Sequence, residues 1–193
     1  MKYTKKLYMA LADAALAHKG QERKNSEGVP YVVHPISVAF IVSTITQKED
    51  VVIAAILHDT LEDTCLPSNI IKEKYGDYVL SLVKYLSEDK DINMSSKEKK
   101  ENWQQRKRQM ILKLKNAPIE ARWIALADNI HNLTSLGLNI ENYSKIFNSS
   151  LPQTLGLYRC RLDELWMKED IISSCKELVE QYKELLKDVE SKL

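Results

Sequence analysis

Apolar residues recur at helical spacing along most of the chain. In the first segment, Leu7, Leu11, Ala14 and His18 follow one another at steps of three or four residues, which places them on one helix face. Five glycines and five prolines offer little turn material for a β fold. The pattern therefore predicts an all-α protein. The expected helices lie near residues 4–19, 35–46, 50–59, 68–75, 77–87, 97–116, 118–135, 153–167 and 169–190.

A length of 193 residues suits one compact helical bundle. We expect a single domain over residues 1–193, with a core at about residues 5–136 and C-terminal helices at about 153–190 packed on it. The last helix carries an apolar stripe that is typical of a face packed on its own domain, and a homodimer seam is the alternative. The stripe consists of Ile171, Cys175, Leu178, Tyr182, Leu185 and Val189.

The composition narrows the class of protein. Lys and Arg (28) nearly cancel Asp and Glu (27), and a net charge of +1 argues against a dedicated nucleic-acid binder. Apolar runs are too short to predict a membrane span. The three cysteines, which are Cys65, Cys160 and Cys175, form no C-x-x-C pair, so a reducing cytoplasmic location is the simplest interpretation.

Two apolar segments carry isolated charges. The run from Val51 to Leu57 leads directly into His58-Asp59-Thr60-Leu61-Glu62-Asp63. Between Trp123 and Leu136, Asp128 and His131 are the sole titratable residues, on a helix that is apolar on nearly every side. A charge in such surroundings needs a cation or strong hydrogen bonds to compensate its burial. The charged residues of both segments therefore predict a bound cation or strong hydrogen bonds beside them.

His34 completes a candidate metal site. It precedes Pro35 at an expected helix start, where the helix dipole disfavours imidazolium, and the neutral imidazole is the form that binds metals. With His58, Asp59 and Asp128 it gives two imidazoles and two carboxylates without a thiolate. This mixture suits Mn²⁺, Fe²⁺ or Zn²⁺ better than Mg²⁺. Open coordination positions would remain for water and substrate.

The order H…HD…D resembles the HD superfamily of metal-dependent phosphohydrolases. The form HDxxED, at residues 58–63, is closer to the alarmone-hydrolase branch, meaning RelA/SpoT-type hydrolase domains and small stand-alone alarmone hydrolases. Order and approximate spacing match over about residues 5 to 136. The segments that carry the resemblance are residues 17–24, 30–39, 57–64 and 126–133.

The resemblance implies Mn²⁺-dependent removal of pyrophosphate from the 3′ position of a small-molecule nucleotide, guanosine 3′,5′-bis(diphosphate) or its pentaphosphate relative. His34, His58, Asp59 and Asp128 match the metal ligands. In addition to these ligands, the resemblance assigns roles to further residues. These are Glu62 and Asp63 as the acidic pair that positions and deprotonates water, Arg23 and Lys24 as basic residues near the nucleotide, Lys90 near the phosphates, and Asn132 and Ser135 as substrate contacts.

The chain departs from the family pattern at three positions beside the site. Ala125, Asn129 and Thr134 stand where relatives commonly have a lysine and two arginines. This loss of positive charge favours, as an alternative, an HD phosphohydrolase acting on another nucleotide, such as an adenosine counterpart or a nucleoside monophosphate. A nucleotide-binding regulator without turnover is the alternative from a different class.

Other charged residues receive structural interpretations. Residues 97–115 hold eight basic and two acidic side chains, and we interpret them as a solvated helix face, with electrostatic steering of a phosphate-rich substrate as the alternative. We expect His131 to be a core residue or a residue that supports the metal ligands. His18 is expected to close the first helix.

Overall fold

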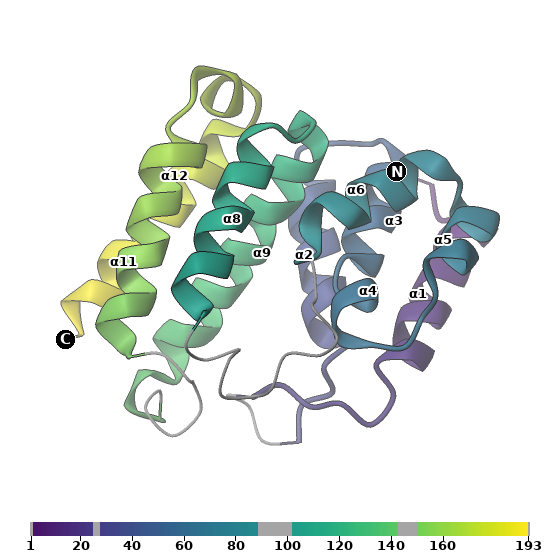
Figure 1. Ribbon diagram of the computed structural model, residues 1–193, viewed down its shortest axis with the longest axis horizontal. Coiled ribbons are helices and arrows are strands. Elements are labelled where there is room, and N and C mark those ends of the chain that lie inside the picture. Colours follow the sequence, from purple (N-terminus) through teal and green to yellow (C-terminus); the bar gives the residue numbers. More distant parts are fainter. Residues whose placement is uncertain (1, 25–27, 89–101, 143–149, 193) are drawn as a thin grey trace.

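The computed structural model describes residues 2–24, 28–88, 102–142 and 150–192 (Figure 1). These residues form helices and no strand, apart from one isolated bridge between Glu22 and Pro30. The prediction of an all-α fold is therefore confirmed. The helices are α1 (Lys5–Ala17), α2 (Val33–Ser43), α3 (Glu49–Leu57), α4 (Thr60–Asp63), α5 (Ser68–Tyr75), α6 (Asp77–Leu86), α8 (Trp103–Lys115), α9 (Ile119–Leu138), α11 (Leu151–Arg161) and α12 (Glu169–Ser191), with short turns of other helical type at Ile140–Asn142 and Leu162–Trp166.

Helix α9 is the central element. It packs against α2, α3 and α6 on one side and against α12 on the other (Figure 1). The sequence explains this position, because α9 is apolar on nearly every side and a helix of that kind must be covered all round. Its buried side chains include Ala121, Ile124, Leu126, Ile130 and Leu133. A polar side chain on α9 therefore lies between two layers of helices.

The apolar stripe of α12 packs within the chain. Ile171, Leu178, Tyr182 and Val189 are buried, and the helix lies along α9. The hydroxyl of Tyr182 donates a 2.8 Å hydrogen bond to the carbonyl of Tyr158 in α11. This packing confirms the interpretation of the stripe as a face turned to the body of the protein.

The segment after α3 differs from the sequence-based prediction. Helix α3 ends at Leu57, two residues early, and an unpredicted short helix, α4, begins at Thr60. The amide of Asp63 donates to the carbonyl of Asp59 at 2.8 Å, which closes the turn of α4. His58 and Asp59 therefore lie at a junction between two helices, where the chain turns their side chains toward α9.

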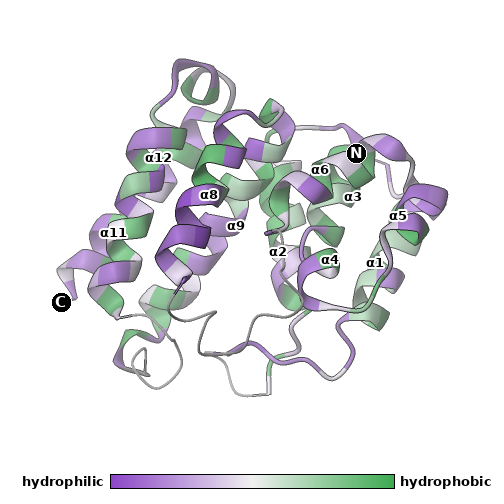
Figure 2. Cartoon of the chain, viewed as in Figure 1, coloured by the Kyte–Doolittle hydropathy of each residue, from purple (hydrophilic) through white to green (hydrophobic). Residues whose placement is uncertain are grey.

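Hydropathy follows the packing of the helices. Figure 2 shows α3 as largely apolar, whereas α8 presents a row of hydrophilic residues to the viewer. Residues Val51 to Leu57 of α3 are all buried. No described helix combines the length and the apolar character that crossing a membrane requires.

A candidate metal centre and its adjoining cleft

Four side chains from separate segments converge beside α9. His34 extends from the first turn of α2, His58 and Asp59 from the junction of α3 and α4, and Asp128 from the middle of α9. Nε2 of His34 lies 3.1 Å from Oδ1 of Asp128 and 3.4 Å from Oδ2 of Asp59. Nε2 of His58 lies 3.1 Å from Oδ1 of Asp59 and 4.0 Å from Oδ1 of Asp128. The structure thus brings the four predicted ligands together.

Neighbouring groups hold both imidazoles in the orientation that a ligand requires. Nδ1 of His58 donates to the carbonyl of Ala55 at 2.8 Å, which leaves Nε2 with a free lone pair. That Nε2 is buried and has no hydrogen-bond partner among the described residues. Nδ1 of His34 lies 2.9 Å from Nδ1 of His131, so its Nε2 also faces the carboxylates. Such outer hydrogen bonds fix ring orientation in metal sites.

The chemistry of this donor set fits a divalent cation. His34 and His58 are 2% and 4% exposed, and the two carboxylates beside them bring negative charge into a largely dry site. Potential ligand atoms of His34, His58 and Asp59 all lie within 4.8 Å of one another. Imidazole nitrogen with carboxylate oxygen is the mixture that Mn²⁺, Fe²⁺ and Zn²⁺ accept. A cation here would neutralise the carboxylates and satisfy Nε2 of His58.

The protonation of His34 differs from the sequence-based expectation. Burial lowers the pKa of this imidazole, but hydrogen bonds and charges from Asp128 and Asp59 outweigh burial and raise the pKa to about 9. The expectation of a neutral ring considered the helix start alone. A helix dipole contributes less than about 1 kcal/mol at such a site, whereas two carboxylates within 3.4 Å act more strongly. Without a cation, His34 therefore holds a proton at neutral pH.

Ion binding should consequently release a proton. Because the pKa of His34 in the fold is about 9, above its ordinary value of 6.5, the imidazolium stabilises the ion-free fold fully below pH 6.5. That stabilisation is lost as the pH rises through about 9. We expect Mn²⁺ affinity to increase up to this pH, with about one proton released per ion at pH 7. Calorimetric titrations in two buffers of different ionisation enthalpy measure this release, and buffer-independent heats would contradict the expectation.

Of the two roles expected for His131, a core residue or a support for the ligands, the structure favours the second, because the ring is only partly buried and lies against the candidate ligand His34. Burial and the charge of His34 lower the pKa of His131 to about 4, so this ring stays neutral and can accept the Nδ1–H of His34. We expect His131→Ala to weaken Mn²⁺ binding by about 10- to 100-fold, since the His34 ring loses its outer partner. Calorimetry measures the affinity, with Leu138→Ala at an exposed position of the same helix as the control. Equal affinities of His131→Ala and wild type would contradict this role.

The acidic pair of α4 lies beside the ligands. The hydroxyl of Tyr31 donates to Oδ2 of Asp59 at 2.7 Å and lies 3.2 Å from Oδ2 of Asp63. Burial raises the pKa of Tyr31, so its hydroxyl keeps the proton that it donates. Oε2 of Glu62 accepts the backbone N–H of Glu88 at 3.1 Å. Burial raises the pKa of Glu62 to about 7, which allows this carboxylate to gain or lose a proton near neutral pH.

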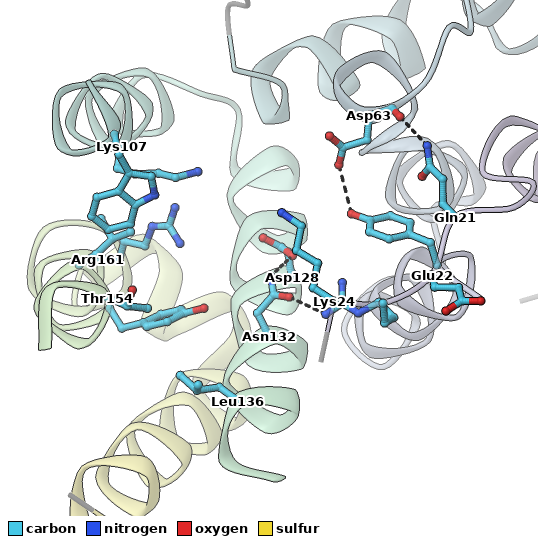
Figure 3. A pocket seen from close by; sticks show the side chains of 15 residues that line it. Gln21, Glu22, Lys24, Asp63, Lys107, Asp128, Asn132, Leu136, Thr154 and Arg161 are labelled. Carbon is cyan, nitrogen blue, oxygen red and sulfur yellow. Dashed lines mark hydrogen bonds between the residues drawn. The ribbon is translucent and has the colours of Figure 1, made fainter. Parts of the chain in front are cut away.

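Two cavities adjoin these groups. The smaller, of about 160 Å³, contains the four candidate ligands together with Glu62, and it extends toward α8. The larger, of about 670 Å³, opens beside it between α9, α11 and the loop before α2 (Figure 3). A volume of this size is typical of small-molecule sites. The residues that line both cavities are Arg23, Tyr31, Asp63, Lys107, Asp128, Asn132 and Arg161.

Three of the predicted substrate residues line the cleft. Nη2 of Arg23 donates to Oδ1 of Asn132 at 3.0 Å, and Nδ2 of Asn132 donates to Oδ1 of Asp128 at 2.6 Å. Lys24 lines the larger cavity (Figure 3). Ser135 is not among the described residues that line either cavity. Lys90 lies outside the described residues.

The basic segment around α8 is more than a solvated face. Lys107 lines both cavities, and Trp103 lines the larger one. Arg106 and Lys107 form ion pairs with Glu88, whose pKa falls below its ordinary value because these charges outweigh its burial. The interpretation as a solvated face is therefore incomplete. Trp103, Lys107 and Leu114 follow one another at steps of four and seven residues, which places them on one helix face. This spacing is the signal in the sequence that this face of the helix turns toward the protein.

Arg161 is a site residue that the sequence analysis missed. It lies at the end of α11, lines both cavities and donates from Nη1 to Oδ1 of Asn129. Asn129 and Ala125 are two of the positions at which the sequence lacks the basic residues of its relatives, and both line the smaller cavity. A guanidinium from a distant helix thus lies beside these neutral positions. Because 32 residues separate the partners, no local pattern indicates their contact.

Comparisons with known proteins agree with this geometry. The model of the family described as HD domain matches residues 10–150. The chain is 35% identical over 125 residues to mouse guanosine-3′,5′-bis(diphosphate) 3′-pyrophosphohydrolase MESH1, covering 64% of this chain and 65% of that protein. The Drosophila melanogaster protein of the same name is 36% identical over 136 residues, covering 69% and 71%. Bifunctional (p)ppGpp synthase/hydrolase SpoT of Escherichia coli is 35% identical over 133 residues, but these cover only 18% of its length.

Solved structures show the same fold. A metazoan orthologue of SpoT, described as hydrolysing ppGpp, superposes with a TM-score of 0.79 at 26% identity, over 97% of each chain. A Listeria monocytogenes protein superposes with a TM-score of 0.67 at 27% identity, over 83% of this chain and 95% of that one. The arrangement of helices around the candidate metal centre is therefore shared with a protein that acts on ppGpp.

Proposed function

Because this chain belongs to the HD domain family, we propose that it is a Mn²⁺-dependent hydrolase of guanosine 3′,5′-bis(diphosphate), or ppGpp, and of its pentaphosphate relative. The products are pyrophosphate and GDP or GTP. One observation carries the proposal: the ligand set and the acidic pair open directly into a cleft of nucleotide size that basic side chains line. Relatives with this activity in their names match 64% and 69% of this chain.

His34, His58, Asp59 and Asp128 would hold the ion. When bound, a divalent cation lowers the pKa of water and withdraws charge from phosphoryl oxygens. Asp59 contacts both imidazoles and accepts the hydroxyl of Tyr31, so it is the residue that organises the set.

Glu62 is suited to the proton transfer. Its carboxylate takes a proton from the attacking water while the water oxygen forms a bond to the phosphorus attached at the 3′ oxygen. The bond between that phosphorus and the 3′ oxygen then breaks, pyrophosphate leaves, and the 3′ oxygen receives a proton. Asp63 shares the hydroxyl of Tyr31 with Asp59, which supports a role for Asp63 as a second carboxylate that positions the attacking water.

The nucleoside fits the larger cavity. Arg23, Lys24 and Asn132 provide donors for phosphate and ribose oxygens on one wall, and the rings of Trp103 and Tyr158 provide surfaces for a base. For Lys90 and Ser135, the proposed substrate contacts rest on the family resemblance alone. The three cysteines are unpaired in the structure, which supports a reducing cytoplasm as the proposed location.

A different nucleotide is the second candidate substrate. The neutral residues at 125, 129 and 134 favour it, because they remove positive charge from α9. Arg161 beside Asn129 opposes it, because this residue returns a cation to the same part of the cleft. A regulator without turnover would have no need of the acidic pair beside the ligands.

A nucleotide panel tests the proposal. The purified protein with Mn²⁺ is incubated separately with ppGpp, its adenosine counterpart, GTP and a nucleoside monophosphate, and the products are separated by anion exchange. We expect conversion of ppGpp to GDP and pyrophosphate, with loss of activity when a chelator is present. Turnover of another nucleotide but not of ppGpp would show that ppGpp is not the substrate. Binding of a nucleotide without any product would show that the protein is a regulator and not an enzyme.

A further inference from the structure

Arg161 occupies the junction of the two cavities. Figure 3 shows it reaching from the side of α8 and α11 toward Asp128 on α9, opposite Lys24. Its Nη1 donates to the side-chain oxygen of Asn129, and its guanidinium lies over the ring of Tyr158 at 5.9 Å. Its Nε is buried and has no hydrogen-bond partner among the described residues. An arginine in a cleft beside the candidate metal centre therefore keeps its Nε–H donor unused.

We propose that Arg161 binds the distal phosphate of the 3′-diphosphate, the part of the substrate that leaves as pyrophosphate. This inference rests on the proposed function and adds to it a residue that determines specificity. The residue acts by binding, and the bonds made and broken in the reaction are unchanged.

Neutral contacts leave the charge of Arg161 available. An amide oxygen and an aromatic ring hold the guanidinium in place, whereas Arg106 and Lys107 are ion-paired with Glu88. The charge of Arg161 reaches Glu88 as well, because it contributes to the lowered pKa of that carboxyl group. A guanidinium that an amide oxygen and an aromatic ring hold in place is preorganised for a phosphate, which it can contact through two N–H groups at once.

The cavity sizes and the position of the ligand set favour the 3′-diphosphate as the group that Arg161 contacts. The smaller cavity, of about 160 Å³, has room for a diphosphate and not for a nucleoside, which fits the cavity of about 670 Å³. The phosphorus under attack must lie at the ligand set in the smaller cavity, next to Asp128. The distal phosphate is one bridging oxygen away. Arg161 bonds to Asn129, the neighbour of Asp128, and so is a cation within the same small cavity.

Binding of inorganic pyrophosphate and of GDP to the Mn²⁺-loaded protein tests this assignment without turnover. We expect Arg161→Gln to weaken pyrophosphate binding by about tenfold or more, while GDP binding changes by less than about twofold. With ppGpp as substrate, KM should rise more than kcat falls. Arg159→Ala is the matched control, because Arg159 is an exposed arginine of the same helix that pairs with Glu190. This control should bind both probes as the wild type does.

Several outcomes would overturn the assignment. The assignment is wrong if Arg161→Gln binds pyrophosphate as tightly as the wild type does, or if it loses affinity for pyrophosphate and GDP equally. It is also wrong if the wild type binds no pyrophosphate. Thermal unfolding and Mn²⁺ affinity show whether the variant is intact, and Arg161→Lys is the second variant if it is not. The lysine variant should bind pyrophosphate with intermediate affinity. A wild type that binds pyrophosphate through Arg161 yet leaves ppGpp intact would refute the proposed function and not this binding site.

Discussion

Replacement of Asp59 by asparagine should lower kcat/KM for ppGpp by about a thousandfold or more, since metal catalysis supplies several kcal/mol and each 1.4 kcal/mol is about tenfold in rate. Oδ1 of Asp59 lies 3.1 Å from His58 and Oδ2 lies 3.4 Å from His34, so this carboxylate joins both imidazoles. Asparagine keeps the shape of the side chain but removes its charge and one ligand oxygen. Mn²⁺ affinity should fall together with turnover.

The fold should survive this change. Asparagine keeps the size of the side chain and leaves the apolar core untouched, so the change removes only the attraction between the Asp59 carboxylate and the imidazoles of His34 and His58. Circular dichroism on heating checks the fold, calorimetry checks Mn²⁺ affinity, and steady-state kinetics at saturating Mn²⁺ check turnover. Asp77→Asn, at an exposed surface position, is the control with unchanged activity. If Asp59→Asn keeps kcat/KM within about tenfold of the wild-type value, Asp59 is not a metal ligand.

The fold and the metal centre follow from strong local patterns. Apolar segments predicted α3 and α9, and the small number of glycines and prolines favoured helices over the strands of a turn-rich β fold. Asp128 was predicted as a ligand because it is an isolated acid on a helix that is apolar on nearly every side. Such a residue has few structural explanations, so its chemistry is visible in sequence.

The rest of the cleft depends on contacts between distant segments. Arg161 meets Asn129, and Lys107 meets Glu88, only after α8 and α11 have packed beside α9. Periodicity within one helix carries no information on these pairs. The raised pKa of His34 has the same origin, since it depends on carboxylates contributed by α9 and by the junction after α3. Composition likewise does not indicate which of the six arginines turns toward the cleft.

Glu62→Gln should lower kcat by about 10²- to 10⁴-fold, the range expected for loss of a general base. Mn²⁺ affinity should change little, because Glu62 is not one of the four converging ligands. The pH profile gives the sharper test. Burial raises the pKa of Glu62 to about 7 from an ordinary value of 4.5, so this carboxyl group is partly protonated at neutral pH in the ion-free protein. A base must be deprotonated, so kcat/KM should increase with pH through this pKa, which a bound cation shifts downward.

In Glu62→Gln this acid limb should disappear from the pH profile, whereas Glu73→Gln, at an exposed position of α5, should retain it. Asp63→Asn separates the two acids of the pair. Asp63 is exposed and shares the hydroxyl of Tyr31, whereas Glu62 is more buried, and burial makes its carboxylate the stronger base. We therefore expect a smaller loss of kcat for Asp63→Asn than for Glu62→Gln. A larger loss for Asp63→Asn, with the acid limb intact in Glu62→Gln, would assign the proton transfer to Asp63.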